Sequence, residues 1–196
     1  MPLSNQQLLM PDAEVYIDRN FITPAESDAL FTDLTANIVW EQKPIQFMGK
    51  TVMQPRLTAW YGDEGKSYTY SGWTVDPMPW TPTLLTLRAR VEGAAGVVFN
   101  SVLLNRYRTG QDSVGWHSDD EPELGTNPVI ASISLGAARN FQFKHKHNPD
   151  LKQTIELTNG TLLLMRGTTQ HFWKHQIPKT TKVLGPRINL TFRVIN

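Results

Sequence analysis

Two short patterns in the sequence contain residues that could bind a metal ion. His117 and Asp119 are two positions apart, and in an extended strand such residues point to the same face. Two histidines and one carboxylate form the ligand set that holds Fe(II) and leaves three coordination positions open. His171 or His175 would supply the third ligand, and strand parity does not choose between them. The alternative interpretation of the isolated pattern is a surface turn with a local hydrogen bond.

The C-terminal segment 186–195 alternates apolar and polar side chains, which is typical of a β-strand. One face carries Ile188, Leu190, Phe192 and Val194, and the other carries Arg187, Asn189, Thr191 and Arg193. The polar face either meets solvent or lines a cavity. In a cavity the two arginines would need anions, because an unpaired buried charge is too costly. A small dicarboxylate fits this requirement, since guanidinium groups bind carboxylates bidentately.

Asn105 and Tyr107 share a face by the same parity, and both offer uncharged hydrogen bonds to such a cavity. Tyr107 equally suits a hydrophobic core. A rival metal pair, His145 and His147, lies between lysines at what reads as the basic end of a hairpin. His171 and His175 would suit a helical zinc site, but the surrounding sequence is strand-like.

The elements that must position these residues are mostly strands. We expect strands at 97–108, 129–135, 140–145, 153–158, 161–165 and 186–195. Thr23-Pro24 predicts the start of a helix that runs to about Asn37, and Thr81-Pro82 predicts a second helix that ends at Gly93 or Gly96. These elements indicate an α+β fold that is mainly β, a sandwich or jelly roll supported by helices. Residues 41–80, which are rich in aromatic side chains, form either a segment packed over the sheet or a lid.

Composition restricts the class of protein. The 196 residues suit one domain, 1–196. No apolar run reaches the roughly 18 residues of a membrane span, and no secretory signal is evident, so we expect a cytoplasmic monomer, or a nuclear one in a eukaryote. The absence of cysteine excludes disulfides, thiolate zinc sites and a cysteine nucleophile. Residues 1–138 hold 16 acidic and 9 basic residues, whereas 139–196 hold 2 and 10, which hints at a polyanionic partner.

In their order along the chain, these motifs closely resemble the AlkB family of Fe(II)- and 2-oxoglutarate-dependent dioxygenases, which repair alkylated nucleic acid. The resemblance rests on Asn-Arg-Tyr at 105–107, His-x-Asp-Asp-Glu at 117–121, His175, and Arg-x-Asn-Leu-Thr-Phe-Arg at 187–193. The stretch GKTVMQPRLTAWYGDEGKSYTYSG is similar to the nucleotide-recognition lid of the DNA-repair members, and PVIASISLGAARNFQFKHK is similar to the family's central strands. It covers about residues 40–195.

This resemblance implies a double-stranded β-helix (jelly roll) core at 97–196, N-terminal supporting helices and a nucleotide-recognition lid at 40–80. It implies that His117, Asp119 and His175 bind Fe(II), since the family's H-x-x-x-H pattern favours His175 over His171. 2-Oxoglutarate would be held by Asn105, Tyr107, Arg187, Asn189, Thr191 and Arg193, with the carboxylate that each arginine binds left open. O2 would be the remaining cosubstrate.

The implied activity is the oxidative demethylation of 1-methyladenine and 3-methylcytosine in DNA, with release of formaldehyde. Substrate contacts would come from Met48, Tyr68, Tyr70, Ser71, Asp120 and Glu121. Met48 falls where duplex-preferring members insert an aromatic wedge, and a flexible methionine departs from that pattern. The alternatives are an RNA demethylase, an oxygenase acting on a protein or small molecule, a jelly-roll binding module without catalysis, and a zinc hydrolase.

Overall fold

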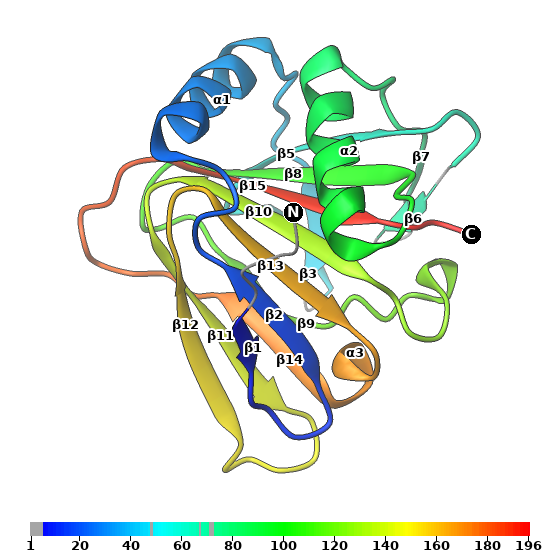
Figure 1. Ribbon diagram of the computed structural model, residues 1–196, viewed down its shortest axis with the longest axis vertical. Coiled ribbons are helices and arrows are strands. Elements are labelled where there is room, and N and C mark those ends of the chain that lie inside the picture. Colours follow the sequence, from blue (N-terminus) through cyan, green and yellow to red (C-terminus); the bar gives the residue numbers. More distant parts are fainter. Residues whose placement is uncertain (1–5, 48, 67, 71–72) are drawn as a thin grey trace.

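The computed structural model describes residues 6–47, 49–66, 68–70 and 73–196, which form two opposed antiparallel sheets (Figure 1). The major sheet has the order β1 (Gln6–Leu8), β2 (Glu14–Asp18), β13 (Thr161–Arg166), β10 (Ile130–Gly136), β15 (Arg187–Arg193), β8 (Ser101–Tyr107) and β5 (Leu57–Gly62). The minor sheet has the order β12 (Lys152–Leu157), β11 (Arg139–His145), β14 (Trp173–Ile177) and β9 (Val114–His117). This arrangement confirms the predicted mainly β, jelly-roll fold.

Two long helices cover the outer face of the major sheet (Figure 1). Helix α1 (Pro24–Asn37) begins where the Thr23 hydroxyl accepts a hydrogen bond from the Glu26 backbone N–H. Helix α2 (Pro82–Ala95) begins at Thr81 in the same way and ends at Gly96, whose φ of 68° is left-handed. Both helices were expected from their capping residues, because a side-chain oxygen there satisfies an otherwise free N–H.

Strand parity divides the interior into two apolar clusters. Ile188, Leu190 and Phe192 of β15 pack towards the helices, in the cluster that also holds Leu84 and Val91 of α2. A second cluster lies between the two sheets and includes Val15, Ile130, Phe143, Leu163 and Trp173. The odd-numbered residues of β15 therefore point between the sheets, and Arg187, Asn189 and Thr191 are all buried there. The polar face of β15 is therefore buried between the sheets and does not meet solvent.

Residues 40–80 contribute two small hairpins beside the major sheet: β3 (Pro44–Phe47) with β4 (Lys50–Met53), and β6 (Tyr68–Tyr70) with β7 (Trp73–Val75). The first hairpin leaves Met53 half exposed. Short helical turns follow at η1 (Pro122–Leu124) and α3 (Thr169–Phe172). Strands β1, β2 and β5 and the turn α3 were not expected from the sequence. Within the described residues, every helix is too short or too polar to cross a membrane.

Candidate active site

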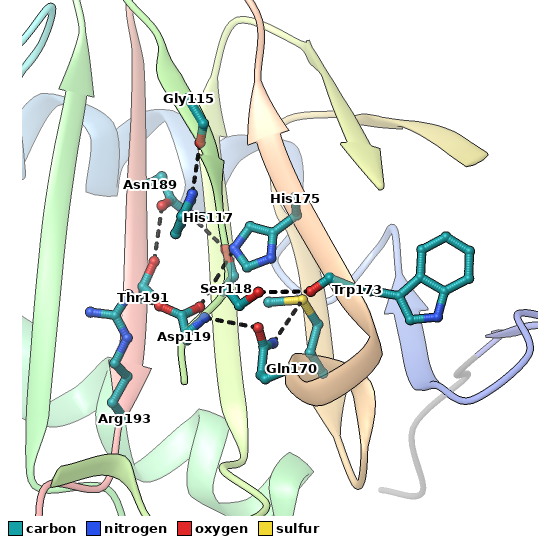
Figure 2. A network of polar contacts seen from close by, with 12 residues as sticks. Gly115, His117, Ser118, Asp119, Gln170, Trp173, His175, Asn189, Thr191 and Arg193 are labelled. Carbon is teal, nitrogen blue, oxygen red and sulfur yellow. Dashed lines mark hydrogen bonds and ion pairs between the residues drawn. The ribbon is translucent and has the colours of Figure 1, made fainter. Parts of the chain in front are cut away.

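The three predicted metal ligands come together at one end of the minor sheet (Figure 2). Strand pairing places His175 of β14 directly opposite His117 of β9. The rings have centroids 4.3 Å apart, and His175 Nε2 lies 3.5 Å from Asp119 Oδ2. One ligand atom from each of His117, Asp119 and His175 lies within 4.8 Å of the others. This cluster is compact enough to share one cation after small side-chain movements.

Asp119 reaches the cluster by a route that strand parity did not predict. Strand β9 ends at His117, so Asp119 lies in the following loop rather than two residues along a strand. The Ser118 hydroxyl donates to the Trp173 carbonyl at 3.0 Å, and the Asp119 N–H donates to Gln170 Oε1 at 2.9 Å (Figure 2). These bonds fix the loop against β14 and α3, and therefore aim the carboxylate at both imidazoles.

His171 stays outside the cluster. It lies in α3, is exposed, and has its Nε2 atom 3.0 Å from Asn127 Oδ1. The expectation that His171 and His175 share a strand face is wrong, because a helical turn separates His171 from β14. Buried His175 is instead stacked on Phe141, with ring centroids 5.1 Å apart.

Hydrogen bonding and burial prepare these side chains for a metal. His117 Nδ1 lies 2.8 Å from the Gly115 carbonyl, which can only accept, so Nδ1–H donates there and Nε2 is the atom that would bind the metal. Burial, with the nearby His117, lowers the pKa of His175 to about 3, so its imidazole is neutral. Burial alone would raise the pKa of Asp119, but Arg193 and both histidines outweigh it and lower that pKa to about 2.

The two arginines of β15 occupy different places in the cavity. Arg193 is ion-paired with Asp119 and therefore lies next to the metal ligands. Arg187 is only 1% exposed, and its Nη2 atom donates to Ser134 Oγ at 2.9 Å. Neither Nε nor Nη1 of Arg187 finds an acceptor among the described residues. Because a buried guanidinium with unpaired donors is costly, this arrangement predicts that Arg187 binds an anion.

The other predicted cosubstrate residues line the same wall. Asn189 donates to Ser132 Oγ at 2.7 Å and to the Ile133 carbonyl, and accepts from Thr191 Oγ1 at 3.0 Å. Its amide is thus largely satisfied within the sheet. Register pairing brings Asn105 opposite Asn189 and Tyr107 opposite Arg187.

Arg56 is a buried neighbour that the sequence reasoning missed. Its Nε atom donates to Asn105 Oδ1 at 2.7 Å, which leaves the Asn105 amide donors free for another group. No spacing rule links Arg56 to Asn105, because the two residues are 49 positions apart and Arg56 lies just before β5.

The predicted substrate residues are less fully placed. Met48 and Ser71 lie outside the described residues. Tyr68 and Tyr70 are the first and last residues of strand β6. Exposed Asp120 is ion-paired with Lys146 at 3.0 Å. The Oε2 atom of Glu121 is buried and finds no partner among the described residues.

The basic residues of the C-terminal segment 139–196 separate into two groups. From its place in this segment we also expected Arg139 to hold phosphates, which is wrong, because it is buried and bonded to backbone carbonyls. Lys144 instead lies on the outer face of the minor sheet with its ammonium 4.5 Å from the centre of the Trp116 ring. Lys152 and Lys174 are its cross-strand neighbours, and both are exposed.

Comparison with known proteins agrees with this geometry. A model of the 2OG-Fe(II) oxygenase superfamily matches residues 14–193. The human alpha-ketoglutarate-dependent dioxygenase alkB homolog 3 is 45% identical over 184 residues, which cover 89% of this chain and 64% of that protein. The human DNA oxidative demethylase ALKBH2 is 42% identical over 181 residues, covering 87% of this chain and 69% of that protein. The chain thus spans about two thirds of these relatives.

A solved structure shares the fold. The structure of OsALKBH1 superposes with a TM-score of 0.69 at 18% identity, and the match covers 97% of this chain and 99% of that one. At this identity the likeness concerns the fold alone. It agrees with the two opposed sheets and the helices on one side.

Proposed function

Since this chain belongs to the 2OG-Fe(II) oxygenase superfamily, we propose that it removes methyl groups oxidatively from 1-methyladenine and 3-methylcytosine in DNA. The observation that carries the proposal is the cluster of His117, Asp119 and His175 beside a buried arginine with unpaired donors. The choice of DNA rests on the 42% identity to the DNA oxidative demethylase ALKBH2. Such a substrate places the protein in the cytoplasm, or in the nucleus of a eukaryote.

The donor set fits the cofactors of this superfamily. His117, Asp119 and His175 would hold Fe(II) through two neutral imidazoles and one carboxylate, a set that leaves three positions for other ligands. When bound, iron with 2-oxoglutarate and O2 supplies the oxidation that hydroxylates a methyl carbon and yields succinate, carbon dioxide and formaldehyde. The three ligand residues of one chain already form the cluster, so the site needs no partner subunit, and we propose that the protein acts as a monomer.

We assign the arginines by their distance from this cluster. Arg193 touches Asp119, so it would bind the carboxylate of 2-oxoglutarate nearest the metal. Arg187, at the other end of β15, would bind the far carboxylate with its unpaired Nε and Nη1 atoms. Asn105 and Tyr107 would add hydrogen bonds along the molecule, while Asn189 and Thr191 would shape the wall behind it.

The protein would recognise the methylated base by attracting its positive charge and by stacking against its ring. Methylation at these ring nitrogens makes adenine and cytosine cationic, and the unpartnered carboxylate oxygen of Glu121 would favour a cation over a neutral base. Asp120, held by Lys146, would contribute negative potential more weakly. The lesion must leave the helix, and stacking on Tyr70 and His117 would offset roughly 1–3 kcal/mol of that cost.

The lysine row of the minor sheet, Lys152, Lys144 and Lys174, would contact the DNA backbone. Like charges placed opposite one another on neighbouring strands repel, so this row destabilises the free protein slightly. Phosphates alongside would relieve the repulsion and release counterions. The row lies on the face of the minor sheet opposite His175, so it would contact backbone away from the lesion.

The test is reconstitution of the protein without oxygen, with Fe(II), 2-oxoglutarate and an oligonucleotide that carries 1-methyladenine, followed by admission of oxygen. We expect succinate and formaldehyde in equal amounts. His175→Ala should abolish both, whereas the matched control His171→Ala should retain activity because His171 is bonded to Asn127 outside the cluster. Faster turnover of the RNA version of the oligonucleotide would refute DNA as the substrate, and succinate without any demethylation would point to a different substrate class.

A further inference from the structure

A second buried arginine lies behind the proposed site of the far carboxylate. Arg139 is the first residue of β11 and is 4% exposed. Its Nη2 atom donates to the Asp112 carbonyl at 2.9 Å and to the Pro178 carbonyl at 2.7 Å, and its Nη1 atom donates to the Thr109 carbonyl. All of these acceptors are uncharged backbone groups. The bonds fix the guanidinium in place but leave its charge without a bonded anion.

The fixed guanidinium lies against the ring of Tyr107. The central carbon of the Arg139 guanidinium is 5.5 Å from the ring centroid, and the corresponding carbon of Arg187 is 5.1 Å from the same centroid. Tyr107 is 2% exposed and pairs with Arg187 across β8 and β15. Two cations therefore share one aromatic ring, each held by attraction to its π-system.

The charges in this region do not balance. Among the described residues, Arg187 has two nitrogens without acceptors, and the hydrogen bonds of Arg139 all go to backbone carbonyls. The carboxylate of Asp112, whose charge acts on Arg139, is already bound by Arg108 through two hydrogen bonds of 2.8 and 2.9 Å. Burial lowers the pKa of Arg187, Tyr107 opposes that effect, and the proximity of Arg139 adds to the lowering. An anion placed at Arg187 would therefore be attracted by two cations.

We propose that Arg139 is a positioning residue that acts through Tyr107 to make the cavity selective for 2-oxo acids with a second, distant carboxylate. It fixes the Tyr107 ring against Arg187 and adds a buried positive charge behind it. The inference rests on the proposed function, since it assumes that 2-oxoglutarate occupies the cavity. The competing explanation is purely structural: Arg139 ties the loop at 109–112 to Pro178.

Ligand binding measured without turnover separates the two explanations. The probes are 2-oxoglutarate and 2-oxopentanoate, which keeps the chelating end and lacks the far carboxylate, titrated calorimetrically into protein loaded with Mn²⁺ in place of Fe(II). The quantity of interest is the ratio of the two dissociation constants. We expect Arg139→Gln to weaken 2-oxoglutarate binding about tenfold, as loss of one nearby charge should, and to leave 2-oxopentanoate unchanged.

The matched control is Arg108→Gln, which loosens the same loop by freeing Asp112 but leaves both cations at Tyr107. It should keep the wild-type ratio. Arg139→Lys retains the charge and should also keep the ratio, and it preserves the test if Arg139→Gln does not fold. Equal weakening of both ligands by Arg139→Gln, or loss of selectivity in Arg108→Gln or Arg139→Lys, would overturn the proposal. Failure of the wild-type protein to bind 2-oxoglutarate at all would instead refute the proposed function.

Discussion

Replacing Arg187 by methionine should separate the stability of the fold from its capacity to bind 2-oxoglutarate. Without ligand, Nε and Nη1 of Arg187 are buried and find no acceptor in the part of the chain that the structure describes, and each such group costs about 1–3 kcal/mol. Methionine removes that cost but also loses the bond to Ser134, worth about 1 kcal/mol, and the contact with Tyr107, worth about 0.5–2 kcal/mol. The ligand-free variant should therefore lie between about 1 kcal/mol less stable and about 4.5 kcal/mol more stable than the wild type.

Binding should change in the opposite direction. At a 2-oxoglutarate concentration 100 times the dissociation constant, ligand stabilises the wild-type protein by about 2.7 kcal/mol. For a chain of this size that raises the melting temperature by roughly 5–10 °C. Arg187→Met, lacking the far-carboxylate site, should show almost no such rise.

The assay is thermal unfolding followed by circular dichroism, with Mn²⁺ present and with or without 2-oxoglutarate. Arg56→Met is the contrasting variant, because Arg56 donates to Asn105 and to the Ser113 carbonyl and its loss should lower stability without ligand. A ligand-free Arg187→Met protein that is several kcal/mol less stable than the wild type would refute the reasoning, since it would mean that the guanidinium is already fully satisfied.

Three further expectations follow from single positions. Gly160→Ala should lower stability by roughly 2 kcal/mol or more, because Gly160 has a φ of 81° and an added Cβ would clash with the Ile22 carbonyl. Gly93 on α2 faces open space, so Gly93→Ala should raise stability by about 0.5–1 kcal/mol. Urea unfolding measures both changes. Glu121→Gln should lower kcat/KM about tenfold for cationic 1-methyladenine but little for neutral 3-methylthymine, and an equal loss on both would exclude a role in charge recognition. Lys144→Glu should reduce the slope of log affinity against log salt by roughly one phosphate contact, as measured by fluorescence anisotropy, and an unchanged slope would remove the lysine row from the interface.

Local sequence patterns predicted those parts of the site that lie on a single strand. The alternation in β15 placed Arg187 and Arg193 on one face and the packing residues on the other, because side-chain direction in a strand has a period of two residues. The helix starts at Thr23 and Thr81 were equally local, since a capping hydroxyl and the proline after it act within one turn.

The parts that depend on contacts between distant strands could not be read from spacing. His171 and His175 were indistinguishable by parity because the helical turn α3, which has only four residues, carries no periodic signal. Asp119 is positioned by the bond from its own N–H to Gln170 and by the bond from the Ser118 hydroxyl to the Trp173 carbonyl. Both partners lie more than 50 residues further along the chain. The resemblance to a family chose His175 where the residues alone left two candidates.

Arg139 shows most clearly why charge patterns in a sequence mislead. It was counted among the basic residues of segment 139–196, yet it is buried and points between the sheets. Lys144, five residues later, remains accessible. Net charge describes the surface only when each charge is on the surface. Within this fold the cationic half contributes in two ways: lysines on the outer face of the minor sheet and arginines inside the cavity.

These internal charges suggest how one site could handle two ligands of opposite sign. Arg187 and Arg139 make one end of the cavity positive, where a dicarboxylate would be attracted. We propose that the cationic base binds at the other end, near Glu121, whose buried Oε2 atom finds no partner among the described residues. Opposite potentials at the two ends disfavour each ligand in the other's place, because a misplaced ligand would meet like charges in a poorly solvated site. Reversing the sign at one end should therefore weaken only the ligand proposed for that end.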